Sequence, residues 1–598
     1  MDLDDVLPQI GEFGKYQKQM LWLICLPACF PCGFCAFNQL FMTDTPEHWC
    51  LVPQLANLTT DHRKNLSIPR INGTFSSCLR YSVNYTEDFE YLDETNQTFW
   101  PVESCKDGFE YDTTTVHSSV VIDFDLVCDK DIYPTLGLVA LNIGGPIGVY
   151  FFGFLNDRIG RKKTFFLCLT TLIIGGLMTA LAPDFWWWAG SRLVVGLTIP
   201  AIYQIPFIIS LELVGPNYRS FITVLTCLFY TVGLMMLAGI TYLIRDWVYL
   251  SLSTSLPFIL YYLYWFYLPE SPRWLLAKGK FEEASAVLES LAKTNNKEIP
   301  ASFKQQLKQR MTNKRSCSEE ERANKHFGLL DLCSTPNMRL KTVLITLNWF
   351  ANNMVYVGLS YYGPSLGSNQ YLSFLLSSAV EIPSYVAAWF LIEKWGRRWP
   401  LCLTMILSGC SCIATVLIPK RNEIATMILF LLSKSTISAS FFIIYPFAGE
   451  LYPTAIRGLG IGASAYIAGM GLIIIPFITY LGSEILVLPI IIMGVISVFG
   501  GLCGLRLPET LHHRLPQTLA EGEEFGKHFC WEDCVQCIPK PRSSRDDLEM
   551  IPVPTEDTPL DCSPEEGRRL SMKKLVRQQS VMDTQKTADG TMTMTYWF

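Results

Sequence analysis

The apolar residues of this chain are gathered into runs of about twenty, and this pattern restricts its fold more than any other feature. A helix of roughly 20 apolar residues is long enough to cross a hydrocarbon core of about 30 Å. About twelve such runs lie between residues 16 and 507. Only 17% of the residues are charged, whereas a soluble domain has about 25%. The sequence therefore predicts an all-α polytopic membrane protein with twelve transmembrane helices.

A long polar loop, residues 43–131, follows the first apolar run, and its motifs indicate which side of the membrane it faces. It holds the Asn-x-Ser/Thr glycosylation motifs of the chain, at Asn57, Asn65, Asn72, Asn84 and Asn96. Such motifs are glycosylated on segments that enter the secretory lumen. The loop also holds an even set of cysteines, Cys50, Cys78, Cys105 and Cys128. We expect an extracellular, glycosylated loop with two disulfides, whose pairing is open among three possibilities.

The short loops on the opposite side of the predicted helices carry basic residues, such as Arg158, Arg219, Lys394 and Arg457. Because cytoplasmic loops are enriched in Lys and Arg, both termini are predicted to be cytoplasmic. Residues 1–18 contain no apolar core, so no cleavable signal peptide is predicted. We expect a multi-pass protein of the plasma membrane.

Two motifs recur along the chain at nearly the same separation, which indicates an internal repeat. NDRIGRKK recurs as IEKWGRR, with glycines at positions 160 and 396. ELVGPNYR recurs as ELYPTAIR, with arginines at positions 219 and 457. Two six-helix repeats with a site between them form a known transporter architecture. The predicted segments are a cytoplasmic N-terminus (1–15), a first six-helix half (16–268) that includes the outer loop, a cytoplasmic linker (269–341), a second six-helix half (342–508) and a disordered cytoplasmic tail (509–598).

Several of these motifs resemble those of known transporters. GFLNDRIGRKK and PESPRWL resemble signatures of the major facilitator superfamily, which sugar porters share. IGEFGKYQ, VEIPSY and GELYPTAIRGLG, together with the cysteine-containing outer loop, resemble the organic cation, organic anion and carnitine transporter family. The likeness extends over essentially residues 5–508. It implies a major facilitator fold that opens alternately to each side of the membrane, without covalent catalysis and without a cofactor or metal.

Charged residues at the cytoplasmic ends of the helices form a predicted conformational latch. An acid there can meet the positive end of a neighbouring helix or an arginine of the other half. The resemblance implies that such contacts hold one state of the transport cycle. The alternative is that the basic residues only fix the orientation in the membrane. The predicted latch residues are Asp157, Arg158, Arg161, Glu212, Arg219, Glu270, Arg273, Glu450 and Arg457.

Two charged residues, Glu381 and Lys434, lie deep inside apolar runs. A charge at the centre of a membrane helix costs roughly 2.5–3.5 kcal/mol, so each residue requires a partner or a cavity. One interpretation is a structural ion pair between two helices of the second half. The other is that one or both residues face a central cavity and bind the charged group of a substrate or a coupling proton.

Aromatic residues provide the other component of a predicted site for cations. A ring face attracts an ammonium group by about 0.5–2 kcal/mol. The resemblance implies a cavity lined by Tyr203, Phe207, Tyr230, Trp349 and Tyr356. Each of these rings could instead serve only in packing. The resemblance also implies an acid in cation transporters, or an arginine in anion and carnitine types, where this chain has Gly469. The predicted substrate charge is therefore open, with a zwitterion as one fit.

These features predict a secondary transporter of small organic cations or zwitterions, such as amines, carnitine-like molecules or amino-acid derivatives, and not an enzyme. The chain has no GxxxxGK[ST] phosphate-binding motif, which argues against an ATP-driven pump. The alternatives are a sugar or organic-anion porter of the same fold, or a receptor or scaffold that does not transport. Predicted partners are the lipid bilayer, a Na⁺ or H⁺ coupling ion, and a PDZ-type domain at the C-terminal Tyr596, Trp597 and Phe598. No nucleic-acid partner is predicted.

Overall fold

The computed structural model describes residues 7, 10–71, 73–83, 85, 100–215, 218–297, 332–367, 369–419, 422–453, 456–485, 487–511, 516 and 518–527, and two short strands further on. These strands are β7 (Gln585–Lys586) and β8 (Met592–Thr593), which pair antiparallel. The predicted glycosylation sites at Asn72, Asn84 and Asn96 lie outside the described residues. The same is true of the predicted PDZ ligand at the C-terminus.

The first half of the membrane domain begins with a broken helix. It consists of α2 (Lys15–Met20), a π-helical turn η1 (Leu21–Cys25), a 3-10 turn η2 (Pro27–Cys29) and α3 (Phe30–Met42). The prolines in this span lack the N–H group that a regular α-helix needs, which accounts for the break at η2. The next four helices are α6 (Tyr133–Ile159), α7 (Arg161–Ala180), α8 (Phe185–Leu213) and α9 (Arg219–Leu243). The sixth crossing joins α10 (Trp247–Ser255) to a 3-10 segment, η8 (Leu256–Trp265).

The second half repeats this arrangement. It begins with α14 (Pro336–Tyr362) and the 3-10 turn η10 (Gly363–Leu366). The next crossing is divided into α15 (Gln370–Ala379) and α16 (Glu381–Trp395). It is followed by α17 (Arg398–Val416), α18 (Glu423–Leu451), α19 (Arg457–Gly471), α20 (Ile475–Glu484) and α21 (Leu488–Leu505), of which α19 and α20 share one crossing.

Within the described residues, ten helical segments are long and apolar enough to cross a membrane. The two remaining crossings of the twelve-helix pattern are α14 and the pair of α10 and η8, and α14 is the less apolar of the two. Helix α14 carries Asn348, Asn352 and Ser360 in its interior, all of them buried. Polar residues inside a membrane helix face the interior of the bundle or a cavity. The lower hydropathy of α14 therefore marks it as a helix that faces the interior of the protein.

A small subdomain interrupts the first half between α3 and α6. Its strands form three antiparallel pairs, β1 (His48–Cys50) with β6 (Phe109–Tyr111), β2 (Arg70–Ile71) with β3 (Thr74–Phe75), and β4 (Leu79–Tyr81) with β5 (Val102–Ser104). Its helical elements are η3 (Pro53–Leu55), α4 (Thr60–Ser67), α5 (Val120–Asp123) and η6 (Cys128–Lys130). Disulfides join Cys50 to Cys105 and Cys78 to Cys128. This pairing is one of the three that four cysteines allow.

At the opposite end of the bundle, short helices pack on the starts of both halves. In the first half, α11 (Pro272–Ala277) and α12 (Phe281–Thr294) share a core with Leu7, Ile10 and Tyr16. In the second half, α22 (Leu519–Glu524) packs on α14, where the Glu523 carboxylate accepts hydrogen bonds from the Asn337 and Met338 amides at 3.0 and 2.9 Å. The tail expected from residue 509 onwards thus includes a helix that packs on the second half.

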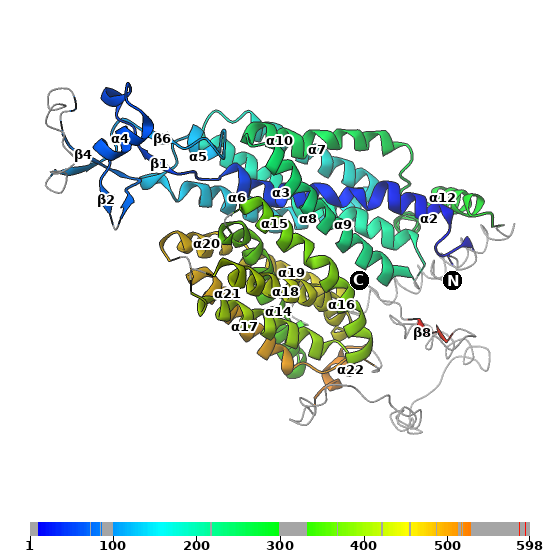
Figure 1. Cartoon of the computed structure of the whole chain (residues 1–598). Helices are drawn as coiled ribbons and strands as arrows, with labels where there is room; N and C mark the ends of the chain where they lie inside the picture. Colours follow the sequence, from blue (N-terminus) through cyan, green and yellow to red (C-terminus); the bar gives the residue numbers. More distant parts are fainter. Residues whose placement is uncertain are drawn as a thin grey trace, which may run out of the picture.

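Each half contributes most of one apolar core, and the two cores share partly buried residues at their boundary. Between the halves, α9 packs against α15 and α16, and α6 packs against α19 and α20. Figure 1 shows the subdomain at one end of the bundle, here called the subdomain end, and α2, α12 and α22 at the other, here called the termini end. At the termini end, α12 and α22 lie well apart (Figure 1).

Glycines allow the closest helix contacts within each half. A Cβ atom built on Gly148 of α6 would lie 1.8 Å from the Leu197 carbonyl oxygen of α8. A Cβ atom on Gly196 of α8 would lie 2.1 Å from the Leu141 carbonyl oxygen. In the second half, a Cβ atom on Gly409 of α17 would lie 2.5 Å from the Gly494 carbonyl oxygen of α21. Small residues let membrane helices pack backbone to backbone, so each half is built around one very close helix pair.

The two disulfides predict a specific pattern of substitution effects. Removing a native disulfide from a small extracellular domain costs about 2–5 kcal/mol. Since Cys50 is bonded to Cys105, we expect Cys50→Ser, Cys105→Ser and the double variant to lower the unfolding midpoint of the purified protein equally. Cys50→Ser combined with Cys78→Ser should lower it further, because both bridges are lost. Equal midpoints for the two double variants would contradict this pairing.

Candidate substrate site and latch clusters

Glu381 is placed by a break in the eighth crossing. Pro383 has no N–H group to donate to the Ala379 carbonyl, and its ring clashes with that carbonyl in a regular helix. Helix α15 therefore ends at Ala379, and α16 begins at Glu381. The carboxylate lies at the first turn of α16, where the helix dipole favours a negative charge. The residue is fully buried.

The two carboxylate oxygens of Glu381 have different surroundings. Oε2 lies within hydrogen-bond distance of three hydroxyl donors, Thr231 at 3.3 Å, Tyr356 at 3.3 Å and Tyr385 at 3.2 Å. Thr231 belongs to α9, so this bond crosses between the halves. Oε1 lies 3.0 Å from the Lys434 ammonium, an ion-pair distance, but receives no well-directed hydrogen bond. Oε1 is therefore the oxygen whose partner is a cation, whereas the partners of Oε2 are hydroxyl groups.

The Lys434 ammonium is enclosed by residues of α14. It donates to Ser360 Oγ and, at 3.4 Å, to the Tyr356 carbonyl oxygen. It also lies 3.6 Å from the centroid of the Tyr356 ring, a cation–π contact. Only 2% of the Lys434 side chain is exposed. The structural ion pair considered from the sequence is present, and it lies against one of the aromatic residues expected to line the site.

The other predicted aromatic residues form two further groups. Tyr203 and Phe207 of α8 stack with ring centroids 6.2 Å apart, and Tyr203 meets Tyr230 of α9 edge-on at 5.7 Å. Trp349 of α14 is buried and meets Tyr445 of α18 edge-on at 4.6 Å. The first group therefore belongs to the first half, whereas Trp349 and Tyr356 belong to the second. Tyr230 is next to Thr231, the residue that joins the first half to Glu381.

Sequence reasoning did not identify several residues around Glu381. Tyr385 follows Glu381 by four residues within VEIPSY, a spacing that places both on one helix face, so the motif contained this signal. Thr231 and Ser360 are common hydroxyl residues in apolar helices, and no sequence pattern distinguishes them from their neighbours. Phe441, which stacks on Tyr356 with centroids 5.0 Å apart, is equally inconspicuous.

Gly469, where the sequence departs from the family pattern, lies at the boundary between the halves. A Cβ atom built on it would meet Pro146 of α6 at 3.6 Å, an ordinary contact distance. Helix α19 packs against α6 at this boundary. A charged side chain at position 469 would therefore begin between the two halves, and this chain leaves that position without one.

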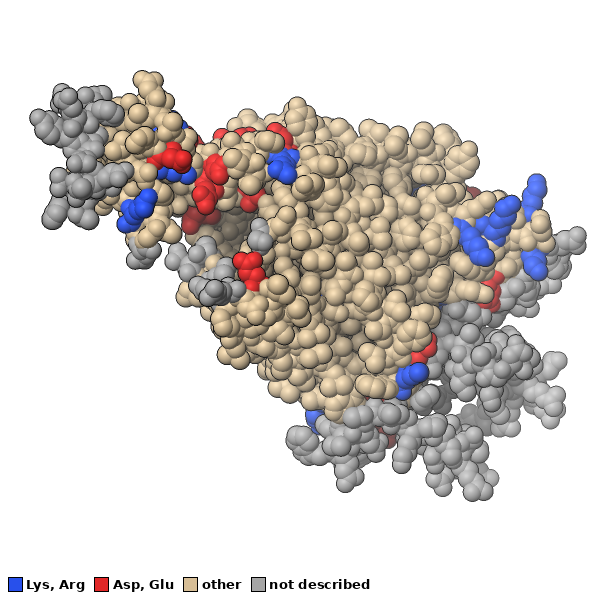
Figure 2. All heavy atoms as spheres, viewed as in Figure 1, with Lys and Arg blue, Asp and Glu red and all other residues tan. Residues whose placement is uncertain are grey.

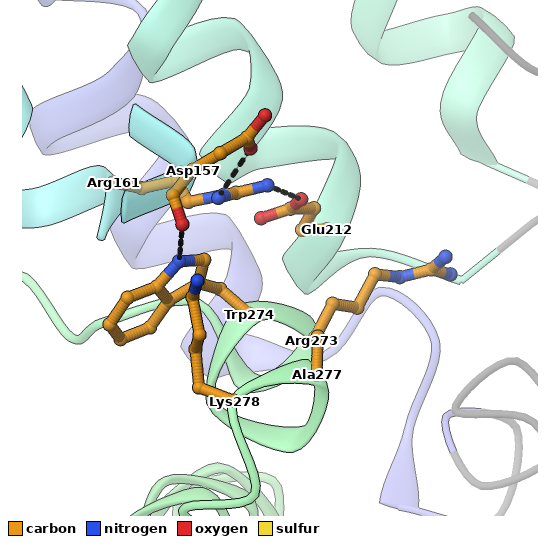
Figure 3. Close-up of a pocket in the computed structure, with 7 residues that line it drawn as sticks. All are labelled: Asp157, Arg161, Glu212, Arg273, Trp274, Ala277 and Lys278. Atoms are coloured by element: carbon orange, nitrogen blue, oxygen red, sulfur yellow. Dashed lines mark hydrogen bonds and ion pairs between the residues drawn. The ribbon is translucent and has the colours of Figure 1, made fainter. Parts of the chain in front are cut away.

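The first-half latch residues gather at the termini end around Arg161. Its guanidinium lies 3.1 Å from Asp157 and 3.3 Å from Glu212. These residues line a cavity of about 370 Å³ with Arg273, Trp274, Ala277 and Lys278. Figure 3 shows Arg161 between the two acids, with Arg273 directed away from them. Glu270 has another role, because its carboxylate accepts from the Arg161 and Lys162 amides at 2.7 and 3.3 Å and so caps α7.

The second half contains a matching cluster. Arg397 lies 3.1 Å from Glu450, with 0% and 4% of the two side chains exposed. Glu509 accepts from the Arg397 and Arg398 amides at 2.8 and 3.0 Å and so caps α17, as Glu270 caps α7. Arg397 and Glu509 were not among the predicted latch residues. The signal was present, since LPES at residues 268–271 recurs as LPET at residues 507–510.

The remaining predicted latch residues make other contacts near the ends of the helices. Arg219 donates to the Leu211 carbonyl at 3.3 Å, and Arg457 donates to the Tyr452 carbonyl at 3.4 Å, so each covers the end of the preceding helix. Arg158 lies over the Phe154 ring at 5.7 Å. The Arg161 and Arg397 clusters each lie within one half. In this state the clusters therefore hold the helices of each half together.

Besides the bond from Thr231 to Glu381, hydrogen bonds between the halves occur at the subdomain end. They join Tyr361 to Asn142 at 3.1 Å, Tyr480 to Asp131 at 2.9 Å, and Gln370 to Asp44. Ring contacts add to them, with Phe41 stacked on Tyr371 at 5.6 Å. Asp44 lies just beyond α3, where burial raises the pKa of its carboxyl group. The halves are thus closed against each other at the subdomain end.

Comparison with known proteins places this arrangement in a family. The model of the sugar (and other) transporter family matches residues 81–518. The carcinine transporter of Drosophila melanogaster is 57% identical over 640 residues, which cover 100% of this chain and 95% of that protein. This chain belongs to the sugar (and other) transporter family. Within it, the chain is a member of the organic cation transporter group.

Two more relatives from Drosophila melanogaster support this membership. The beta-alanine transporter is 41% identical, over 94% of this chain and 95% of that protein. The organic cation transporter protein is 37% identical, over 88% of this chain and 95% of that protein. The family predicted from the motifs is therefore confirmed. As a member, the chain is a multi-pass membrane transporter and not an enzyme, as predicted.

Solved structures confirm the fold. The inward open conformation of the xylose transporter XylE from E. coli superposes with a TM-score of 0.52, over 84% of this chain and 99% of that protein. The sequences are 15% identical, so the likeness concerns the fold alone. The predicted major facilitator fold of two six-helix halves is therefore confirmed.

The two arginine clusters predict unequal effects of matched substitutions. Breaking a fully buried ion pair costs about 3–5 kcal/mol, whereas a partly exposed pair contributes about 0–1 kcal/mol. Glu450→Gln should therefore lower the unfolding midpoint of the detergent-solubilised protein much more than Glu212→Gln, the equivalent change in the first half. Similar shifts for the two variants would show that burial does not separate the clusters.

Proposed function

We propose that this chain carries small organic cations and zwitterions across the plasma membrane, and that Glu381 Oε1 receives the substrate's ammonium group. One observation supports this most strongly. Oε2 is surrounded by three hydroxyl donors, whereas Oε1 has only an ion-pair contact. A buried carboxylate oxygen whose partner in the empty protein is an ammonium group is suited to accept the ammonium group of a substrate. The Tyr356 ring next to it favours the same kind of group.

The proposed substrate class follows from the charges at the site and from the relatives. The relatives are named for carcinine, which contains a primary amine, and for beta-alanine, which is a zwitterion. Glu381 can accept an ammonium group, and Lys434 can pair with a carboxylate. We propose that Tyr203, Phe207, Tyr230 and Trp349 form the aromatic walls of the same path. The absence of a charge at Gly469 favours substrates that carry their own counter-charge.

The proposed orientation places the subdomain outside the cell and both termini in the cytoplasm. Asn57 is exposed on the subdomain and is available for glycosylation, and Asn65 is partly exposed. On the face that Figure 2 shows, the bundle between its two ends carries almost no charged residues, and Lys and Arg gather at the termini end, with some also at the subdomain end. Exposed residues there include Lys15, Lys18 and Lys278. Basic residues are enriched on the cytoplasmic side of membrane proteins. A Na⁺ or H⁺ coupling ion and a PDZ partner stay predictions.

The proposed mechanism is rocking of the two halves around Glu381. The subdomain end is closed by the Tyr361–Asn142 and Tyr480–Asp131 bonds. Opening that end would break these bonds and bring the two latch clusters together at the termini end. Because each half is held by very close glycine contacts and by capped helices, it can move as a unit. In this proposal the latch residues stabilise the state that is open to the outside.

The Glu381 assignment predicts a selective loss of uptake. Glu381→Gln removes the charge that attracts the ammonium, and a hydrogen bond to a charged group contributes about 1.5–3 kcal/mol. The apparent affinity for carcinine and β-alanine should fall roughly 10- to 100-fold in radiolabelled uptake by transfected cells. Glu393→Gln is the matched control, because Glu393 is exposed on the same helix. Surface labelling corrects for expression. Unchanged affinity in Glu381→Gln would refute the assignment.

A further inference from the structure

The Lys434 ammonium makes the two contacts that a substrate ammonium would make at this site. It lies 3.0 Å from Glu381 Oε1 and 3.6 Å from the centroid of the Tyr356 ring. Both contacts are made deep inside the bundle, with Glu381 completely buried and Lys434 almost so. A substrate ammonium and the Lys434 ammonium cannot both occupy this position.

We propose that Lys434 is an internal substitute for the substrate: it neutralises Glu381 in the empty carrier and is displaced when a substrate ammonium binds. This inference rests on the proposed function of Glu381 as the ammonium acceptor. It assigns Lys434 a role in the return of the empty carrier, beyond a structural ion pair. The displaced lysine ammonium needs hydrogen-bond acceptors other than Glu381, and the structure provides them.

The ammonium of Lys434 already has two hydrogen-bond acceptors other than Glu381. These are Ser360 Oγ and the Tyr356 carbonyl oxygen, which both belong to α14. A small rotation of the lysine side chain would keep both bonds and free Oε1. Oε2 would keep Thr231, Tyr356 and Tyr385, so the carboxylate would stay in position. The lysine can thus give up Oε1 without losing its other two acceptors.

A carrier must change conformation twice in each cycle, once loaded and once empty. A bare carboxylate inside the membrane domain is costly, so an empty carrier without a counter-charge would be held back. With Lys434 present, Glu381 is neutralised in both passages, first by the substrate and then by the lysine. Without Lys434, only the loaded carrier would change conformation readily. Such a variant would exchange substrate for substrate but would release it poorly into substrate-free buffer.

The nature of the substrate determines what Lys434 does after displacement. A simple monoamine leaves the lysine on Ser360, where it still competes for Oε1. A zwitterion such as β-alanine has a carboxylate that can pair with the displaced ammonium. Removal of the lysine should therefore strengthen binding of a monoamine, because a competitor is lost. It should weaken binding of a zwitterion, because a partner is lost.

The test uses the full-length protein in liposomes loaded with radiolabelled carcinine. Efflux into substrate-free buffer measures net transport, and efflux into buffer with unlabelled carcinine measures exchange. For Lys434→Met we expect at least about a tenfold loss of net efflux, with exchange retained within about threefold. Lys434→Arg should retain both, because it keeps the charge. Lys394→Met is the matched control, since Lys394 is exposed at the end of α16.

Acidification adds a second readout to the split between net efflux and exchange. The titratable groups around Glu381 are Lys434, Cys227 and the tyrosines Tyr230, Tyr356 and Tyr385. In Lys434→Met, a proton on Glu381 can replace the missing ammonium, so low pH should restore net efflux. The double variant Glu381→Gln, Lys434→Met carries neither charge. This double variant should still fold, but it should bind substrate poorly at every pH.

The outcomes separate this inference from the proposed function. Net efflux of Lys434→Met equal to that of the wild type would overturn the inference, while the loss of affinity in Glu381→Gln would still support Glu381 as the acceptor. Equal loss of net efflux and exchange in Lys434→Met, with substrate still bound, would also overturn it. Unchanged binding in Glu381→Gln would instead overturn the proposed function, and the inference with it.

Discussion

In the hydrocarbon core of a membrane, every backbone N–H and C=O group must find its hydrogen bond within the protein. This constraint determines where the helices of this chain can be interrupted. The break before Glu381 occurs where α15 and α16 pack against α9, so protein covers the freed backbone groups. Pro383 creates the break, and the break places the carboxylate at a helix start inside the bundle. The proposed site therefore depends on one interruption that only the interior of the protein can tolerate.

The internal repeat extends beyond the motifs to the contacts that they make. Glu270 and Glu509 each follow the sixth crossing of their half, and each caps the start of the third. Arg161 and Arg397 each pair with an acid at the end of the fourth crossing. The halves differ in burial, because the Arg397 pair is almost completely enclosed and the Arg161 pair lines a cavity. The same arrangement of hydrogen bonds thus occurs in a buried form and in a more accessible form.

Much of the architecture was predictable from the sequence, since hydrophobic run length and motif recurrence depend on local sequence. The fold, the family and the burial of Glu381 and Lys434 within apolar runs followed from such features. The partners of these charges did not. Thr231 of the first half donates a hydrogen bond to Glu381 of the second half, and no sequence pattern predicts this contact. The helix caps made by Glu270 and Glu509 could have been predicted, because LPES recurs as LPET. They were missed because an acidic residue just after a membrane helix is also typical of the start of a polar tail.

The cap made by Glu509 sets where the second half ends. Glu509 lies beyond the last apolar run, yet it binds the amides at the start of α17, and Glu523 does the same for α14. A polypeptide shortened to its last membrane helix would leave both helix starts without their carboxylates. On the ribosome, α17 and α14 emerge long before these acids are synthesised. The second half can therefore reach its final form only after translation has passed well beyond its last crossing.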